Sequence, residues 1–429
     1  MFLKGSIFSV ILLTVSLVTT SLLGDEQPNV IIIFTDDQGS VDMNIYGSTD
    51  LSTPNMDRLA RQGVRFTQFY AAGPVCVPSR IGLLTGRIPQ YGGLEGSGPL
   101  GSQIMISEEM KKAGYATAHI GKWHLNHGAD ARPNDQGFDY SFGHMDGCID
   151  NYSHYFYWNG PNRHDLWRNG EEVFHDGEFF PNLMVQEAGD FIERNHDKPF
   201  FLYFAMNSPH YPYQGTPKWL EHYSDLEYPR NLYAAFLSTM DERIGKLLQK
   251  LDDLGLRENT IVIFQSDQGH STEVRAHGGG GNSGPYRGAK GSLYEGGIRI
   301  PAIISWPGRL PENEVRDQMC TSCDWYPTIL ELCDLPAAQQ RVSGKSLLPV
   351  LISAESPSAH KDFYWKHNDK WAVRQGNWKL VASGKTPELY DIPNDPGEVA
   401  NLADEYPEVV TRLMGVGNKY RESRASSYK

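Results

Sequence analysis

The chain has 429 residues and a formal net charge of −13 at neutral pH. Nucleic-acid phosphates attract cationic proteins, so an acidic chain is a poor candidate for binding nucleic acid. The same charge disfavours an anionic small substrate unless cationic residues gather at one place. A chain of this length can form two domains, or one large domain with an appendage.

The N-terminus has the pattern of a secretory signal peptide. Lys4 gives a short basic start, residues 7–23 carry no charge, and Gly24 precedes a polar chain. We therefore predict a signal peptide over residues 1–24, a secreted or periplasmic protein, and no stable membrane insertion after cleavage. An uncleaved membrane anchor is the alternative, because the apolar run is about the minimum length for a span.

Three apolar runs predict strands that are buried on both faces. They cover Asn29 to Phe34, Phe200 to Ala205, and Thr260 to Phe264. Such runs are typical of parallel sheets, whose two faces are both covered. Helical patterns lie between them, for example Thr53 to Gln62 and Leu232 to Leu254. Strands alternating with helices predict an α/β sheet with helices on both faces.

Two of these strands end in acidic turns. Asp36 and Asp37 follow the first strand, and Asp267 and Gln268 follow the third. The carboxyl ends of parallel strands meet at one sheet edge, which is where ligands bind in such folds. Carboxylate and amide oxygens favour calcium or magnesium over zinc. Taken alone, the Asp pair also suits a helix cap or a turn.

After about residue 345 the pattern changes to short strand-like runs separated by turns. The final segment, from about Asn401 to Tyr420, has a helical pattern. We predict a small antiparallel sheet with a terminal helix, and domain boundaries at 25–345 and 346–429. The predicted strands are Asp362 to Trp365, Trp371 to Arg374, Trp378 to Val381, and Glu388 to Asp391.

Five cysteines are too few for a disulfide scaffold in a chain of this length. An odd number in a secreted protein leaves one thiol that needs an explanation. Cys320, Cys323 and Cys333 lack a fourth ligand at zinc-site spacing, so buried thiols or one disulfide are favoured. The remaining cysteines are Cys76 and Cys148.

The most specific segment runs from Cys76 to Arg87 and reads C-V-P-S-R-I-G-L-L-T-G-R. It resembles the signature of the type I sulfatases, C-x-P-S-R followed by L-T-G-R. The resemblance implies that a formylglycine-generating enzyme oxidises Cys76 to formylglycine (3-oxoalanine), which also explains the odd cysteine. The alternative is a buried structural cysteine ahead of a helix.

The resemblance extends over nearly the whole chain after the predicted signal peptide. It implies a three-layer, alkaline-phosphatase-like α/β fold with helices on both faces, plus a small C-terminal antiparallel α+β subdomain. The matching segments are Asn29 to Gly39, Gly121 to Leu125, Ser208 to His210, Lys290 to Pro301, and Glu388 to Leu402.

The resemblance also implies a metal site. One Ca²⁺ ion, or less favourably Mg²⁺, would be bound by Asp36, Asp37, Asp267, Gln268 and the modified Cys76. Gln268 departs from the family pattern, which most often has Asn there. Glutamine keeps the amide oxygen but places it one methylene further from the backbone.

Catalytic roles follow from the same resemblance. Arg80 holds the formylglycine hydrate, and Lys122 and Lys290 bind the sulfate. His210 or Lys290 protonates the departing alcohol, and His124 accepts the proton whose loss expels sulfate. Lys122 and His124 lie two residues apart, so an extended segment would point both to one side. The alternatives are solvated lysines and histidines that are hydrogen-bonded in the core.

The predicted activity is hydrolysis of sulfate monoesters, with a sulfated saccharide of a polysaccharide as substrate. The rival functions are a phosphate or phosphonate ester hydrolase of the same superfamily and an inactive secreted glycan-binding homologue. Aromatic residues able to stack on sugars are Trp158, Trp167, Trp365 and Trp371. Further pocket candidates, each with an ordinary packing or surface role as the alternative, are Asn151, Tyr152, His154, Arg163, His164, His270, His277, His367 and Lys370.

Overall fold

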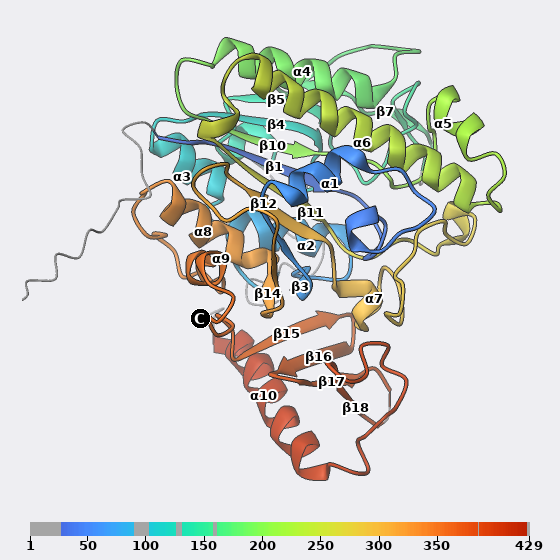
Figure 1. Ribbon diagram of the computed structural model, residues 1–429, viewed down its shortest axis with the longest axis vertical. Coiled ribbons are helices and arrows are strands. Elements are labelled where there is room, and N and C mark those ends of the chain that lie inside the picture. Colours follow the sequence, from blue (N-terminus) through green and yellow to red (C-terminus); the bar gives the residue numbers. More distant parts are fainter. Residues whose placement is uncertain (1–26, 90–102, 126–130, 158–160, 385, 427–429) are drawn as a thin grey trace, which may run out of the picture.

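A ten-stranded mixed sheet forms the centre of the protein in a computed structural model (Figure 1). The structure describes residues 27–89, 103–125, 131–157, 161–384 and 386–426; the predicted signal peptide lies outside them. In spatial order the strands are β13 (Glu314–Arg316), β2 (Val64–Phe66), β12 (Ala302–Ser305), β11 (Thr260–Ser266), β1 (Asn29–Thr35), β10 (Phe200–Ala205), β4 (Ala116–Lys122), β5 (Tyr140–His144), β8 (Trp167–Arg168) and β9 (Glu171–Glu172).

The five central strands, β11, β1, β10, β4 and β5, are parallel to their neighbours within this group. Every residue of β1 is buried. Ile31 and Ile33 pack into the core on one face, whereas Val30, Ile32 and Phe34 pack into the core on the other. This two-sided burial explains the continuous apolar run. The carboxyl ends of β1 and β11 lie side by side and position the site described below.

Helices cover both faces of this sheet (Figure 1). One face carries α1 (Pro54–Arg61), α4 (Phe180–Arg194), α5 (Pro217–His222) and α6 (Arg230–Asp253). The other carries α2 (Cys76–Thr85), α3 (Ile106–Lys112), α8 (Trp325–Leu332) and α9 (Leu348–Ile352). The predicted three-layer α/β arrangement is therefore confirmed. None of the described helices has the length and apolar composition needed to cross a bilayer.

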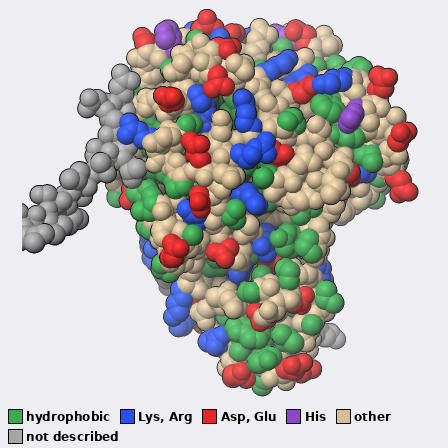
Figure 2. Space-filling model, in the orientation of Figure 1, with side chains coloured by type: hydrophobic (Ala, Val, Ile, Leu, Met, Phe, Trp, Pro, Cys, Tyr) green, Lys and Arg blue, Asp and Glu red, His purple; other side chains and the backbone are tan. Residues whose placement is uncertain are grey.

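The C-terminal segment forms a narrower lobe at the bottom of Figures 1 and 2. Its helix α10 (Pro407–Ser426) packs on the sheet through Val409 and Leu413. The helix begins later than the predicted Asn401, because Asn401 Oδ1 accepts hydrogen bonds from the backbone of Leu389 and Ala403. The four antiparallel strands are β15 (Asp362–His367), β16 (Lys370–Gln375), β17 (Trp378–Ala382) and β18 (Glu388–Asp391).

A buried ion cluster joins this lobe to the main sheet domain. Lys379 Nζ lies 2.9 Å from Glu295 Oε1 in α7 (Glu295–Ile298) and 2.9 Å from Glu398 Oε1, and all three side chains are buried. Residues of α9 pack in the core of the main sheet although they follow residue 345. The domain division at that residue stays a prediction.

All five cysteines are free and buried. Cys320 and Cys333 belong to one face's core, and Cys323 lies in the cluster between the main domain and the C-terminal sheet. The structure therefore supports the buried-thiol interpretation rather than a disulfide.

Candidate active site

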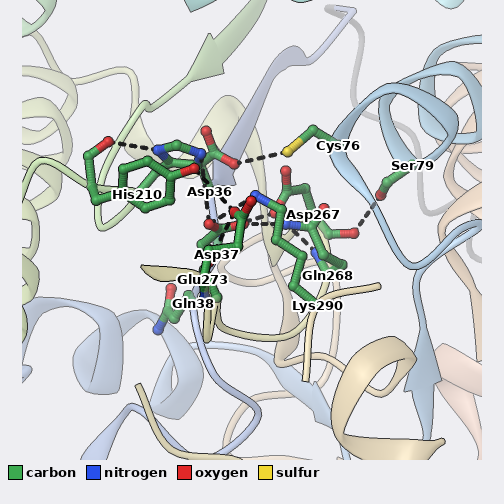
Figure 3. A network of polar contacts seen from close by, with 12 residues as sticks. Asp36, Asp37, Gln38, Cys76, Ser79, His210, Asp267, Gln268, Glu273 and Lys290 are labelled. Carbon is green, nitrogen blue, oxygen red and sulfur yellow. Dashed lines mark hydrogen bonds and ion pairs between the residues drawn. The ribbon is translucent and has the colours of Figure 1, made fainter. Parts of the chain in front are cut away.

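The two acidic turns and the cysteine meet at the carboxyl edge of the central strands (Figure 3). Asp36 and Asp37 follow β1, Asp267 follows the adjacent β11, and Cys76 is the first residue of α2. One potential ligand atom from each of these four residues lies within 4.8 Å of the others, and all four are buried. The predicted convergence of distant segments is present in the fold.

Helix α2 begins at Cys76 itself. Arg80 lies one turn further on and is completely buried. Its Nη1 donates to the carbonyl of Lys122 at 3.0 Å, and its Nη2 lies 3.8 Å from Asp36 Oδ2 and 3.7 Å from Asp267 Oδ2. The helix that begins at Cys76 therefore places a guanidinium against two acidic residues.

Two lysines from other segments complete the cationic side of the site. Lys122, at the end of β4, bonds Asp36 Oδ2 and lies 3.6 Å from Cys76 Sγ. Lys290 Nζ lies 2.8 Å from Asp37 Oδ1. Three basic side chains thus face three carboxylates, and a bound divalent cation would leave two surplus positive charges. This local balance makes an anionic substrate compatible with an acidic chain.

The two predicted catalytic histidines both lie near these charges. His210 Nδ1 bonds the Tyr211 carbonyl at 2.6 Å, and its Nε2 lies 3.7 Å from Asp37 Oδ2. Burial, followed by the charge of Lys290, holds the pKa of His210 well below its usual range. Burial and the charge of Lys122 likewise lower the pKa of His124. Both imidazoles are therefore neutral in the free site.

His124 differs from the expected extended geometry. Its φ of 56° is left-handed, so the chain turns immediately after β4 instead of continuing as a strand. Its ring lies against Gly147, where a β-carbon would come within 2.9 Å of the imidazole. The expected same-side placement of Lys122 and His124 therefore loses its basis in an extended segment, and Gly147 makes room for the His124 ring.

The carboxylates differ in how well their charges are compensated. Burial raises the pKa of Asp36, but Lys122 and other cations outweigh this and hold it well below 3.8. Burial raises the pKa of Asp37 to about 6 despite Lys290. Burial and the charge of Asp36 raise the pKa of Asp267 well above its usual value. The charges of Asp37 and Asp267 are therefore less well compensated than that of Asp36, and a divalent cation bound to them would stabilise their ionised forms.

Two buried oxygen atoms add to this fit. Asp267 Oδ2 and Gln268 Oε1 have no hydrogen-bond partner among the described residues. The Gln268 amide nitrogen bonds Asp37 Oδ1, so the amide already borders the carboxylates. Rotating this amide by half a turn would exchange its oxygen and nitrogen. The donor set is rich in oxygen and fits a hard divalent cation such as Ca²⁺ or Mg²⁺.

Burial also acts on the sulfur. Burial, and after it the charge of Asp36, raises the pKa of the Cys76 thiol far above its usual value. The unmodified thiol is therefore protonated at neutral pH, and a protonated thiol is a weak nucleophile.

Sequence reasoning missed several neighbours of the site. Ser79 Oγ donates to the Asp267 carbonyl, and the Tyr203 hydroxyl accepts from Arg80 at 3.3 Å. His144 and Cys148 lie close enough for the charge of Lys122 to act on their pKa values. Ser79 belongs to the conspicuous Cys76 segment. Tyr203 and His144 lie in strands β10 and β5 and look like ordinary core residues in the sequence.

The predicted sugar-stacking residues differ in whether they can be reached by a sugar. Trp167 lines a cavity of about 570 Å³ together with Arg132, Arg163 and His164. Trp365 and Trp371 are 0% and 6% exposed, so the expectation that they could stack on a sugar is wrong. Trp158 lies outside the described residues.

Comparisons with known proteins agree with this geometry. Residues 28–335 match the family model described as Sulfatase, and residues 287–421 match that described as N-sulphoglucosamine sulphohydrolase, C-terminal. Human N-acetylgalactosamine-6-sulfatase is 31% identical, over 93% of this chain and 86% of that protein. N-acetylgalactosamine-6-O-sulfatase of Bacteroides thetaiotaomicron is 30% identical, over 90% of this chain and 92% of that protein.

A solved structure matches as well. The crystal structure of Ps i-CgsB in complex with k-i-k-neocarrahexaose has a TM-score of 0.84 and 29% sequence identity, covering 94% of this chain and 93% of that one. The family match covers well over half of the sequence, including both acidic turns and the Cys76 segment. The chain belongs to the sulfatase family and is a sulfuric ester hydrolase.

Proposed function

We propose that this sulfatase removes sulfate from sulfated saccharides and that its working nucleophile is Cys76 after oxidation to formylglycine. The observation that carries the proposal is the position of Cys76. It begins α2, its sulfur lies 3.6 Å from Lys122 Nζ, and it shares the cluster of ligand atoms with Asp36, Asp37 and Asp267. This position supports a nucleophile, a metal site and a sulfate-binding lysine that lie next to one another.

The two groups that the family implies have distinct chemistry. Formylglycine, as its hydrate, supplies one hydroxyl that attacks sulfur and a second whose deprotonation releases sulfate. A Ca²⁺ ion held by Asp36, Asp37, Asp267, Gln268 and the modified residue 76 would lower the pKa of the attacking hydroxyl and draw charge from the sulfate oxygens.

The remaining work falls to the protein's own side chains. Arg80 orients residue 76 from the next turn of α2, and Lys122 and Lys290 bind the sulfate oxygens. His210 protonates the leaving alcohol through Nε2, because its Nδ1 is engaged by the Tyr211 carbonyl. A bound anion favours the protonated imidazole and so opposes the low pKa of the free site. His124 accepts the proton of the second hydroxyl, whose deprotonation releases sulfate.

The cavity beside the site supports a saccharide substrate. Met145 is part of its lining, and the Met145 carbonyl accepts a hydrogen bond from the His124 backbone at 3.1 Å. Trp167 offers an aromatic face to a sugar ring, and Arg132 and Arg163 offer donors to hydroxyl or further sulfate groups. Two relatives are named for N-acetylgalactosamine sulfates and a solved neighbour holds a neocarrahexaose.

Maturation and location form part of the same proposal. A formylglycine-generating enzyme acts on Cys76, the signal peptide over residues 1–24 directs the chain to the periplasm or outside the cell, and the mature protein divides into residues 25–345 and 346–429. The acidic composition and the interspersed acidic and basic side chains on the face in Figure 2 give no support to nucleic-acid binding.

The direct test has two parts. Mass spectrometry of the peptide carrying residue 76 should show formylglycine in protein made with the maturation enzyme. The matured enzyme should then release sulfate from at least one member of a panel of defined sulfated saccharides, and should act more slowly on the corresponding phosphate esters. Faster hydrolysis of the phosphate esters would favour the phosphatase alternative, and no hydrolysis by matured enzyme would favour the binding-protein alternative.

A further inference from the structure

A second group of potential ligands lies outside the proposed active site. One ligand atom each from His154, His164 and Asp176 lies within 4.8 Å of the others. His154 precedes the short strand β6 (Tyr155–Phe156), His164 ends the paired strand β7 (Arg163–His164), and Asp176 lies before α4. Three separate backbone segments therefore contribute to this cluster.

Backbone hydrogen bonds hold these segments together. The amide of Asp165, next to His164, donates to the His154 carbonyl at 2.9 Å. The amide of Gly177, next to Asp176, donates to the Tyr152 carbonyl at 2.8 Å. The three side chains therefore start from fixed neighbouring positions.

The hydrogen bonds of the two histidines determine which nitrogen is free to bind a ligand. His154 Nε2 lies 3.0 Å from the Glu178 carbonyl, which can only accept, so Nε2 carries the proton. His164 Nδ1 lies 2.9 Å from Glu172 Oε1, and a carboxylate likewise accepts the proton. In each ring's neutral form a lone pair therefore remains, on Nδ1 of His154 and on Nε2 of His164.

Neither of these nitrogens has a hydrogen-bond partner among the residues that the structure describes. His154 is completely buried, and the His164 side chain is only 5% exposed. Phe174 stacks on the His164 ring, with 4.5 Å between ring centroids. Buried polar atoms are normally paired, so these two nitrogens are available to a ligand that reaches both.

We propose that His154, His164 and Asp176 bind a zinc ion separate from the active-site cation. Neutral imidazole and carboxylate ligands suit zinc, whereas calcium prefers oxygen ligands. Histidine ligands of zinc usually donate their second nitrogen to a carboxylate or a carbonyl, and both histidines do so here. Water supplies the fourth ligand of a tetrahedral site.

The spacing needs only a small adjustment. Ligand atoms bound to one tetrahedral zinc at about 2.0–2.1 Å lie roughly 3.3 Å apart. One ligand atom of each residue already lies within 4.8 Å of the others, and the Asp176 side chain is exposed, so rotation of this side chain can shorten the remaining distances.

The proposed ion would stabilise one wall of the cavity beside the active site. Asp165 follows His164 and accepts hydrogen bonds from the amides of Met145 and Asp146, at 3.0 and 2.9 Å. All four residues line that cavity. Loss of the zinc should therefore lower the thermal unfolding midpoint and raise KM more than it lowers kcat. The zinc proposal itself does not depend on which saccharide enters the cavity.

The test uses the full-length purified protein, stripped with a chelator and then loaded with Zn²⁺ alone or Ca²⁺ alone. Elemental analysis after desalting should find one zinc per wild-type chain. Asp176→Asn and His164→Gln should each lose this zinc but keep calcium. His196→Gln, which changes an exposed histidine outside the cluster, should keep it. Cobalt in place of zinc should give visible absorption bands of a tetrahedral ion in wild type and His196→Gln, but not in the two ligand variants.

Circular dichroism should show that Asp176→Asn is folded, since this side chain is exposed. The proposal is overturned if the folded wild type retains no zinc, or if both ligand variants retain as much as wild type. It is also overturned if Asp267→Ala, a change in the active site, removes the zinc while Asp176→Asn does not.

Discussion

Lys290 contacts both carboxylate oxygens of Asp37, with its Nζ 2.8 Å from Oδ1 and 2.9 Å from Oδ2. Asp37 is also a proposed cation ligand, so one carboxylate serves both the metal site and a sulfate-binding lysine. A cation bound to Asp37 draws negative charge away from Lys290 and leaves that ammonium group free to bind sulfate. Cation binding and substrate binding are therefore expected to be coupled.

Asp267→Ala should lose the divalent cation, and its activity should fall by more than about 100-fold. Substituting a residue that only supports a metal ligand already costs about 10–100-fold in metal affinity or activity, and Asp267 is a proposed ligand itself. Elemental analysis and sulfate release from the same preparation provide the two measurements. Asp190→Ala, at an exposed position of α4, is the matched control and should keep both. Full activity in exhaustively chelated wild type would contradict the role of the cation.

His210→Ala should affect substrates according to their leaving groups. A sugar alkoxide needs protonation as it departs, whereas a nitrophenolate does not, so we expect a loss of about 10²–10⁴-fold on sugar sulfates and a much smaller loss on an aryl sulfate. The ratio of kcat/KM on the two substrates is the measurement. Equal losses on both would remove His210 from the acid role and leave Lys290 as the remaining candidate.

His124→Ala should block the second half of the reaction. Without a base to deprotonate the second hydroxyl of residue 76, sulfate should remain on this residue after the alcohol has departed. Mass spectrometry of the quenched enzyme should then show the added mass on the peptide that carries residue 76. If no such mass accumulates while activity falls, His124 has another role.

Glu398→Gln should change how stability depends on pH. Burial, partly offset by Lys379, raises the pKa of Glu398 from 4.5 to about 7. Between these values the folded protein keeps a proton that the unfolded chain has released, so the carboxyl's contribution to stability falls as pH rises through this window. The loss over this window is on the order of 3 kcal/mol.

Thermal unfolding at pH 5 and pH 8 measures this effect. The fall in the unfolding midpoint between these values should be smaller for Glu398→Gln than for wild type. Glu405→Gln changes an exposed glutamate of the same lobe and should behave like wild type. An unchanged pH dependence in Glu398→Gln would exclude this contribution.

The central strands and the oxygen-rich edge were predictable because both leave strong local patterns. Strands buried on both faces need continuous apolar runs, as in β1, β10 and β11, and the residues that follow parallel strands meet at one edge. The Cys76 segment supplied the chemistry through its resemblance to a family. These three features were enough to place Asp36, Asp37, Asp267 and Cys76 together.

Features set by long-range packing were not predictable. Trp365 resembled an exposed aromatic residue of a small sheet, but its indole donates to the Ala71 carbonyl at 2.8 Å, against the main domain. Trp371 packs under α10 on the other face. The sheet is covered on both sides, and strand alternation alone does not reveal this. His154, His164 and Asp176 meet only through loop hydrogen bonds, for which the sequence has no periodic signal.

Sulfate release by Cys76→Ser tests the central claim most directly. Serine can accept sulfate once, but it has no second hydroxyl whose deprotonation could release it. We therefore predict multiple turnovers for matured wild type and at most one equivalent of alcohol, with no free sulfate, for each folded Cys76→Ser chain. Continued sulfate release by Cys76→Ser at the wild-type rate would contradict a formylglycine nucleophile at this position.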